Sequence, residues 1–171
     1  MHFGPRRLGA AALIIGLVSG LDGCLQGEAD SDTPPALAQT DGTGTVVSIT
    51  DGDTLRLEVD GRELRVRLIG IDTPEVFPEV ECFGPEAEAA LAALAPPGST
   101  IGFTYDRDPR DQYDRELLYL FAADGTSINL ELVEQGFARA VLFEPNDRYW
   151  NELRAAERAA QDAGLGLWAT C

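Results

Sequence analysis

The sequence predicts an α+β protein in which a five-stranded β-barrel of the OB type is capped by about three helices. Three observations support this fold class. Five short runs are rich in β-branched and apolar residues, only tight-turn signals separate the first three runs, and helical segments follow the third and fifth. The chain has 171 residues, which suffices for one domain with its own core and a surplus of about 40 residues.

The first three expected strands form a meander at residues 45–50, 54–59 and 63–71. Both connections contain the dipeptide Asp-Gly, which is a strong signal for a tight hairpin turn. The end of the third strand is therefore expected near the turn that joins the first two. Two later strands, at 100–106 and 115–122, flank a charged loop.

Three helices are expected from apolar residues at helical spacing and from their stop signals. The first covers 84–95, with Pro85 in its first turn, and the second covers 127–136. The last begins near residue 146 or 147 and ends at Gly164. Its buried face is expected to hold Trp150, Leu153, Ala156 and Ala160.

Residues 1–23 resemble a bacterial export signal. The short basic leader MHFGPRR precedes the apolar run LGAAALIIGLVSGL, which is too short to span a bilayer comfortably. The run ends in LDGC, which resembles the lipobox of bacterial lipoproteins, although Asp22 is uncommon there. Cys24 is therefore the expected lipidation site. Residues 24–44 are poor in large apolar side chains and are expected to form a flexible linker to a domain at 45–171.

These N-terminal features predict a location outside the cytoplasm, as a cell-envelope lipoprotein or a secreted protein. A lipid anchor would make the membrane a partner, and the chain is expected to be a monomer. In an oxidising compartment the two remaining cysteines, Cys82 and Cys171, are expected to form a disulfide that ties down the C-terminus. Two unrelated thiols are the alternative.

Composition excludes several kinds of catalysis. The only histidine is His2, within the signal, and the chain contains no lysine. A Ser-His-Asp system, a His-ligated zinc and a lysine Schiff base are therefore excluded from the mature chain. Any catalysis must use carboxylates, arginines, hydroxyls and a hard, oxygen-binding cation. The net charge of −16 argues against general affinity for nucleic acid, because phosphates are repelled.

Two motifs at the expected strand ends carry oxygen ligands. DGDT, at 51–54, joins the first two strands, and RLIGIDTPE, at 67–75, ends the third. We expect Asp53 and Asp72 to face one another, where two carboxylates require a shared proton or a divalent cation between them. Each motif alone is equally consistent with ordinary turn residues beside a proline.

A third motif, DQYDR, places Arg115 at the start of a strand, where a lone arginine is usually a solvated surface group. Taken together, DGDT, RLIGIDTPE, GPEA, DQYDR, VEQGFA and the terminal GLW resemble the staphylococcal-type nuclease family, also called thermonucleases. The resemblance covers 45–168 in order. It implies a calcium-dependent nuclease, a phosphodiester hydrolase of the endonuclease type, that acts on DNA or RNA outside the cytoplasm.

The resemblance also implies the role of each site residue. Calcium would be held by the carboxylates of Asp53 and Asp72 and by the backbone carbonyl of Thr73. Glu75 would hold or deprotonate the attacking water. The remaining members of the implied site are two phosphate-binding arginines and one substrate-binding tyrosine: Arg67, Arg115 and Tyr113.

Departures from the family pattern concern substrate affinity. Asp114 stands where the family usually has glycine, which brings a negative charge near the phosphate pocket. The loop after Glu75 is short and acidic, and Val141 and Phe143 replace tyrosines expected beside the base. Two other functions remain open: a catalytically inactive OB-type module that binds nucleic acid or protein, and a structural lipoprotein whose carboxylates bind calcium.

Overall fold

The structure is a computed structural model that describes residues 39–171. The expected signal at 1–23, the lipidation site Cys24 and most of the linker expected at 24–44 lie outside the described residues. The first strand begins at Gly42, a few residues before the expected start of the domain. No helix within residues 39–171 is long and apolar enough to cross a membrane.

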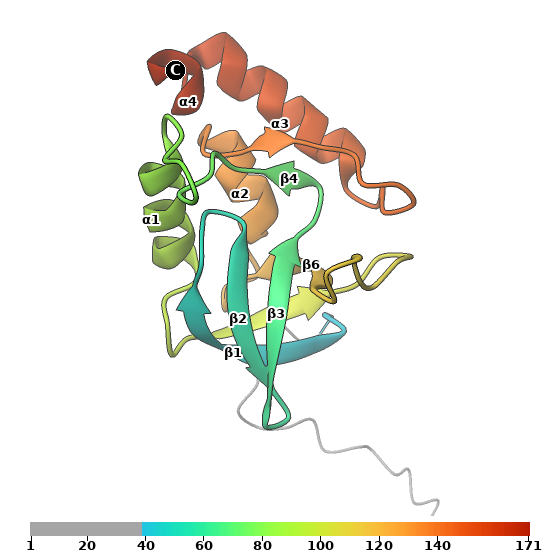
Figure 1. The fold of residues 1–171 in the computed structure, drawn as a ribbon. Helices are drawn as coiled ribbons and strands as arrows, with labels where there is room; N and C mark the ends of the chain where they lie inside the picture. Colours follow the sequence, from blue (N-terminus) through green and yellow to red (C-terminus); the bar gives the residue numbers. More distant parts are fainter. Residues whose placement is uncertain (1–38) are drawn as a thin grey trace, which may run out of the picture.

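Five strands close into a barrel, as the sequence predicts (Figure 1). The strand order around the barrel is β1-β2-β3-β6-β5, and all neighbours are antiparallel except β3 and β6, which are parallel. The strands are β1 (Gly42–Ile49), β2 (Thr54–Val59), β3 (Arg62–Leu68), β5 (Thr100–Thr104) and β6 (Glu116–Phe121). Alternate residues of β2 and β3, such as Leu55, Leu57 and Val66, point inward and are fully buried.

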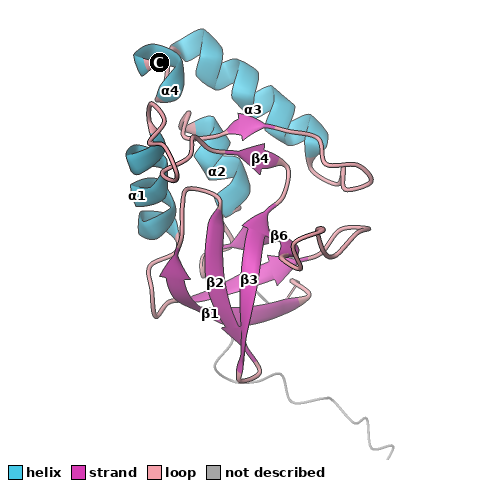
Figure 2. Ribbon diagram, in the orientation of Figure 1, coloured by secondary structure: helices cyan, strands magenta, loops and turns pink. Residues whose placement is uncertain are grey.

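Helices cover one side and the upper end of the barrel (Figure 2). They are α1 (Gly84–Leu94), α2 (Ile128–Glu134), α3 (Trp150–Ala163) and the single turn α4 (Leu167–Thr170). The α+β class and the helical cap are thus confirmed. Gly164 ends α3 in the left-handed conformation expected of a C-terminal glycine.

The last helix begins at Trp150, later than the sequence predicts. Asn146 does not start the helix, because its side chain is hydrogen-bonded to the backbone of Asp108. Its buried amide accepts a hydrogen bond from the Asp108 N–H at 2.8 Å and donates one to the Asp108 carbonyl at 3.0 Å. These bonds hold the 106–115 loop, which contains DQYDR, against the segment before α3. Trp150 is only half-buried and stacks with the guanidinium of Arg154. The prediction that Trp150 lies on the buried face of this helix is therefore wrong.

The third expected strand, at 63–71, is broken in two. β3 ends at Leu68, and the chain turns at Gly70, whose φ is +81°. It resumes as β4 (Ile71–Asp72), which pairs with β7 (Arg139–Ala140) instead of continuing in the barrel. A Cβ at Gly70 would lie 2.5 Å from the Leu153 side chain, so both conformation and packing require glycine here. Because of this break, the IDTPE segment leaves the barrel wall and runs across the upper end of the barrel.

Cys82 and Cys171 form a disulfide, with their Cα atoms 5.9 Å apart and a separation of 89 in sequence. The bridge fixes the C-terminus to the loop that follows Glu75. Closing so long a loop restricts the unfolded chain, which stabilises the folded state in the loop-entropy account.

We predict that Cys171→Ser lowers the free energy of unfolding by about 2–4 kcal/mol, because the unfolded chain regains its freedom. Urea denaturation of the oxidised protein measures the loss. Reduction of the wild type should reproduce it, whereas reduction of the variant should have no further effect. Equal stability of the oxidised wild type and the variant would contradict the prediction.

Candidate active site

A cleft of about 400 Å³ opens where the β1–β2 turn, the end of β3 and the segment after β4 meet. It brings together five of the residues singled out in the sequence. The cleft is lined by Asp51, Asp53, Thr54, Arg67, Ile69, Asp72, Glu75, Asp111, Arg115, Leu117 and Phe143. Residues from four separate segments of the chain therefore face one another, as the meander predicts for two of them.

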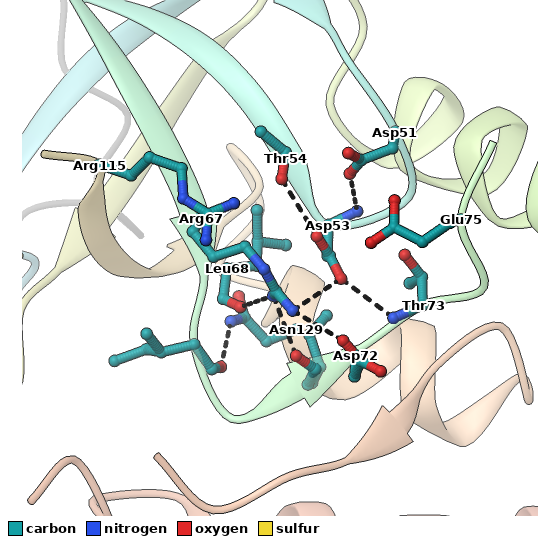
Figure 3. A network of polar contacts seen from close by, with 12 residues as sticks. Asp51, Asp53, Thr54, Arg67, Leu68, Asp72, Thr73, Glu75, Arg115 and Asn129 are labelled. Atoms are coloured by element: carbon teal, nitrogen blue, oxygen red, sulfur yellow. Dashed lines mark hydrogen bonds and ion pairs between the residues drawn. The ribbon is translucent and has the colours of Figure 1, made fainter. Parts of the chain in front are cut away.

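An ion pair between Asp53 and Arg67 lies at the bottom of the cleft (Figure 3). The Arg67 Nη2 and the Asp53 Oδ2 are 3.0 Å apart, and both residues are buried, at 8% and 5% exposure. Burial raises the pKa of the Asp53 carboxyl to about 6; Arg67 opposes this effect, whereas the nearby Asp51 and Asp72 carboxylates add to it.

Arg67 also connects the two halves of the broken strand. Its Nη1 donates hydrogen bonds to the carbonyls of Leu68, at 2.6 Å, and Ile71, at 2.9 Å. Its Nη2 reaches Asp72 Oδ1 at 3.0 Å. The sequence predicts a shared proton or a divalent cation between Asp53 and Asp72. In the structure the guanidinium of Arg67 bridges them.

Glu75 lies at the rim of the cleft, with its carboxylate turned toward Asp53 and Asp51 in Figure 3. Partial burial and then the charges of Asp51 and Asp72 raise its pKa. Its backbone is held by Glu81, whose carboxylate accepts from the Glu75 N–H at 3.1 Å and whose own N–H donates to the Glu75 carbonyl at 2.9 Å. The loop that Cys82 anchors therefore positions Glu75.

Arg115 enters the cleft from the loop before β6. Its Nε donates to Asp111 Oδ2 at 2.7 Å, and its own N–H donates to Asp111 Oδ1 at 3.0 Å. Burial acts to raise the pKa of Asp111, but the bonds from Arg115 outweigh it and the pKa is lowered. The ring of Tyr113 lies 5.6 Å from the Arg115 guanidinium and is 62% exposed, outside the cleft lining.

Asp114 adopts a φ of +59°, so it takes over the left-handed position that glycine occupies in the family pattern. Its carboxylate points away from the cleft and pairs with Arg110 at 3.1 Å. The competing charge expected from this substitution is therefore absent from the lining of the cleft.

Thr73 stabilises the β1–β2 turn that carries Asp53. Its N–H donates to Asp53 Oδ2 at 3.0 Å, and its side chain packs so tightly on Gly52 that a Cβ there would lie 2.7 Å from the Thr73 hydroxyl. The glycine of DGDT is thus required by this close contact.

Two supporting residues were not foreseen. Asp111 holds Arg115, and its spacing of four from that arginine within a polar loop was the available signal. Asn129, buried in α2, accepts from the Leu120 N–H at 2.9 Å and donates to the Ile69 carbonyl at 2.9 Å. Asn129 thereby joins β6 to the chain just beyond β3. A lone asparagine within a helix is not a sequence pattern that would indicate this role.

The donor set of the cleft fits a hard divalent cation in its chemistry. Carboxylates outnumber guanidiniums five to two among the lining residues, and every candidate ligand is oxygen. Within residues 39–171, no group of three or more Asp, Glu, His and Cys side chains is arranged to hold a metal by itself. The ligand set would therefore have to include carbonyl groups and water.

Comparisons with known proteins agree with this geometry. A family model described as "Staphylococcal nuclease homologue" matches residues 65–170. The chain is 35% identical over 144 residues to a thermonuclease of Staphylococcus intermedius, covering 81% of this chain and 85% of the relative. It is 32% identical over 129 residues to a thermonuclease of Staphylococcus hyicus, covering 74% and 75%.

A third relative is the endonuclease YncB of Bacillus subtilis strain 168, which is 33% identical over 123 residues, 69% of this chain and 57% of that protein. The family model spans more than half of the chain and includes every lining residue from Arg67 onward. The chain belongs to the staphylococcal nuclease family.

Proposed function

We propose that this protein is a calcium-dependent nuclease that hydrolyses phosphodiester bonds of DNA or RNA outside the cytoplasm. The observation that carries the proposal is one cleft that holds two arginines, the carboxylate of Glu75 at its rim, and the neighbouring carboxylates of Asp53 and Asp72. The relatives named thermonuclease and endonuclease support the hydrolysis of phosphodiester bonds.

The two arginines suit a phosphate group. Arg67 lies in β3 and Arg115 in the loop before β6, both line the same cleft, and each is oriented by a carboxylate. Guanidinium groups match the geometry of phosphate oxygens, and fixed positive charge stabilises the extra negative charge of the transition state. Because Asp111 holds Arg115 before substrate arrives, little reorganisation is needed during the reaction.

Asp53 and Asp72 would hold calcium together with the Thr73 carbonyl. A bound calcium ion would supply positive charge beside the phosphate and allow an anionic substrate to approach so acidic a protein. Glu75 accepts a proton from water, the water oxygen bonds to phosphorus, and the phosphorus–oxygen bond to the leaving sugar breaks as that sugar oxygen takes up a proton from solvent. Its position at the rim leaves room for that water.

The N-terminal signal, with Cys24 as its lipidated end, would place this activity at the cell envelope. We predict that the wild type requires detergent for extraction from membranes, whereas Cys24→Ala is recovered without it, because the lipid is lost. Fractionation with detection of the protein measures this. Wild-type protein in the medium with an N-terminus beyond Cys24 would contradict the anchor and favour secretion.

Substitutions in the cleft should separate water activation from calcium binding. Glu75→Gln should slow cleavage of single-stranded DNA by about 100-fold or more and leave calcium affinity nearly unchanged. Asp72→Asn should weaken calcium binding at least about tenfold. Asp72 is the better choice for this test than Asp53, because removing Asp53 would take away the buried carboxylate partner of Arg67 and leave only the half-exposed Asp72. Calorimetric calcium titration and cleavage rates measure the two effects.

The same assay decides between the enzyme and the inactive binding module. Plasmid DNA and RNA are incubated with calcium, and again with a chelator. If the purified wild type leaves both intact in calcium, the proposal fails and the binding module takes its place.

Arginine variants should separate phosphate binding from folding. Arg115→Lys retains charge but loses the fork, so cleavage should fall by about 100-fold while the free energy of unfolding changes little. Asp111→Asn should slow cleavage about tenfold, because Arg115 loses its orientation. Arg67→Lys should reduce both activity and stability, because the carbonyls of Leu68 and Ile71 lose their donor. Unchanged cleavage by Arg115→Lys would contradict the assignment.

A further inference from the structure

We propose that Arg65 binds a backbone phosphate next to the scissile one, so that the outer face of β3 forms a substrate track leading out of the cleft. The inference rests on the proposed function, because it needs a nucleic-acid strand held in the cleft by Arg67 and Arg115.

Arg65 lies on the same face of β3 as Arg67. Val66 between them is fully buried in the barrel, so the two flanking side chains point outward. Two residues along a strand correspond to about 7 Å, which is comparable with the separation of successive phosphates on an extended nucleic-acid strand. A strand whose scissile phosphate lies at Arg67 therefore brings its neighbouring phosphate to Arg65. In Figure 1, β2 and β3 run side by side from the end of the barrel near β4 down to the hairpin at its other end.

The charge of Arg65 is available to a ligand, unlike that of most arginines near the cleft. No carboxylate lies within ion-pair distance of Arg65 among residues 39–171. The acidic side chains around it are matched to other arginines: Glu63 to Arg56, and both Asp114 and Glu116 to Arg110. Arg65 is exposed and lines a depression of about 170 Å³ together with Arg110 and these three acidic residues.

A like charge stands opposite Arg65 in the sheet. Arg56 of β2 is its direct cross-strand partner, and both side chains are exposed. Like charges at such a pair repel, but Arg56 is paired with Glu63, which offsets the repulsion. Arg65 is therefore the arginine of this pair whose charge is left for a bound anion.

The loop of Arg115 connects this face to the cleft. Arg65 Nη1 lies 3.4 Å from the Tyr113 carbonyl, at the limit of a hydrogen bond, and Tyr113 in turn stacks on Arg115. The guanidiniums of Arg65 and Arg115 therefore lie on either side of one residue, and a strand can pass from one to the other without crossing an unpaired carboxylate.

Short substrates of defined length test the proposal. The rates, as kcat/KM, are measured on a thymidine dinucleotide, which has one phosphodiester, and on a tetranucleotide. The length gain is the ratio of kcat/KM on the tetranucleotide to kcat/KM on the dinucleotide. This length gain should be about tenfold smaller for Arg65→Gln than for the wild type. Arg158→Gln is the matched control, because Arg158 is also exposed and without an ion pair but lies on α3. In this control the gain should equal that of the wild type.

The salt dependence provides a second readout. For binding of a longer oligothymidylate, Arg65→Gln should reduce the slope of log affinity against log salt by about one, as expected for one lost phosphate contact. An unchanged length gain and an unchanged slope would overturn the proposal. If the wild type cleaves neither substrate, the proposed function fails, and the binding measurement alone judges Arg65. Equal affinities of Arg65→Gln and Arg158→Gln would then overturn it.

Discussion

The buried guanidinium of Arg67 is the group on which both the scaffold and the cleft depend. Burying a charge is costly unless it is paired and its hydrogen-bonding groups are satisfied. Arg67 meets this condition with two carboxylates and two backbone carbonyls, all within 3.0 Å. The carbonyls lie on either side of the break at Gly70, so one side chain fixes both the turn in the chain and the position of Asp72. Folding of this segment and assembly of the site are consequently the same event.

Local signals in the sequence were enough to predict most strands of the barrel. The Asp-Gly turns and the alternating residues of β2 and β3 depend on neighbours in the chain, and such features can be recognised without a structure. The proximity of Asp53 and Asp72 followed from the same meander. The break of the third strand did not, because β4 pairs with β7, almost 70 positions later, and the apolar LIGI stretch is compatible with an unbroken strand. Its single hint was the glycine within the run.

The contacts that Asp111 and Asn129 make could not be predicted from the sequence, for a different reason. Asp111 and Asn129 act through hydrogen bonds whose partners are decided by tertiary placement, and acidic loop residues and helical asparagines are common. Asp114 shows the opposite case. Its tolerance of a left-handed backbone could be anticipated from its side chain, but the direction of its carboxylate depended on Arg110, which no pattern linked to it.

The disulfide between Cys82 and Cys171 closes the domain from Cys82 to its C-terminal residue into a covalent ring. The ring includes Arg115, Asp111 and Asn129, whereas Asp53, Arg67, Asp72 and Glu75 all lie outside it on the N-terminal segment. A single cut in a surface loop within the ring opens the backbone without releasing a fragment, so Arg115 and Asp111 stay covalently attached to the N-terminal segment that carries Arg67. One cleavage therefore leaves the whole lining of the cleft in one covalent molecule.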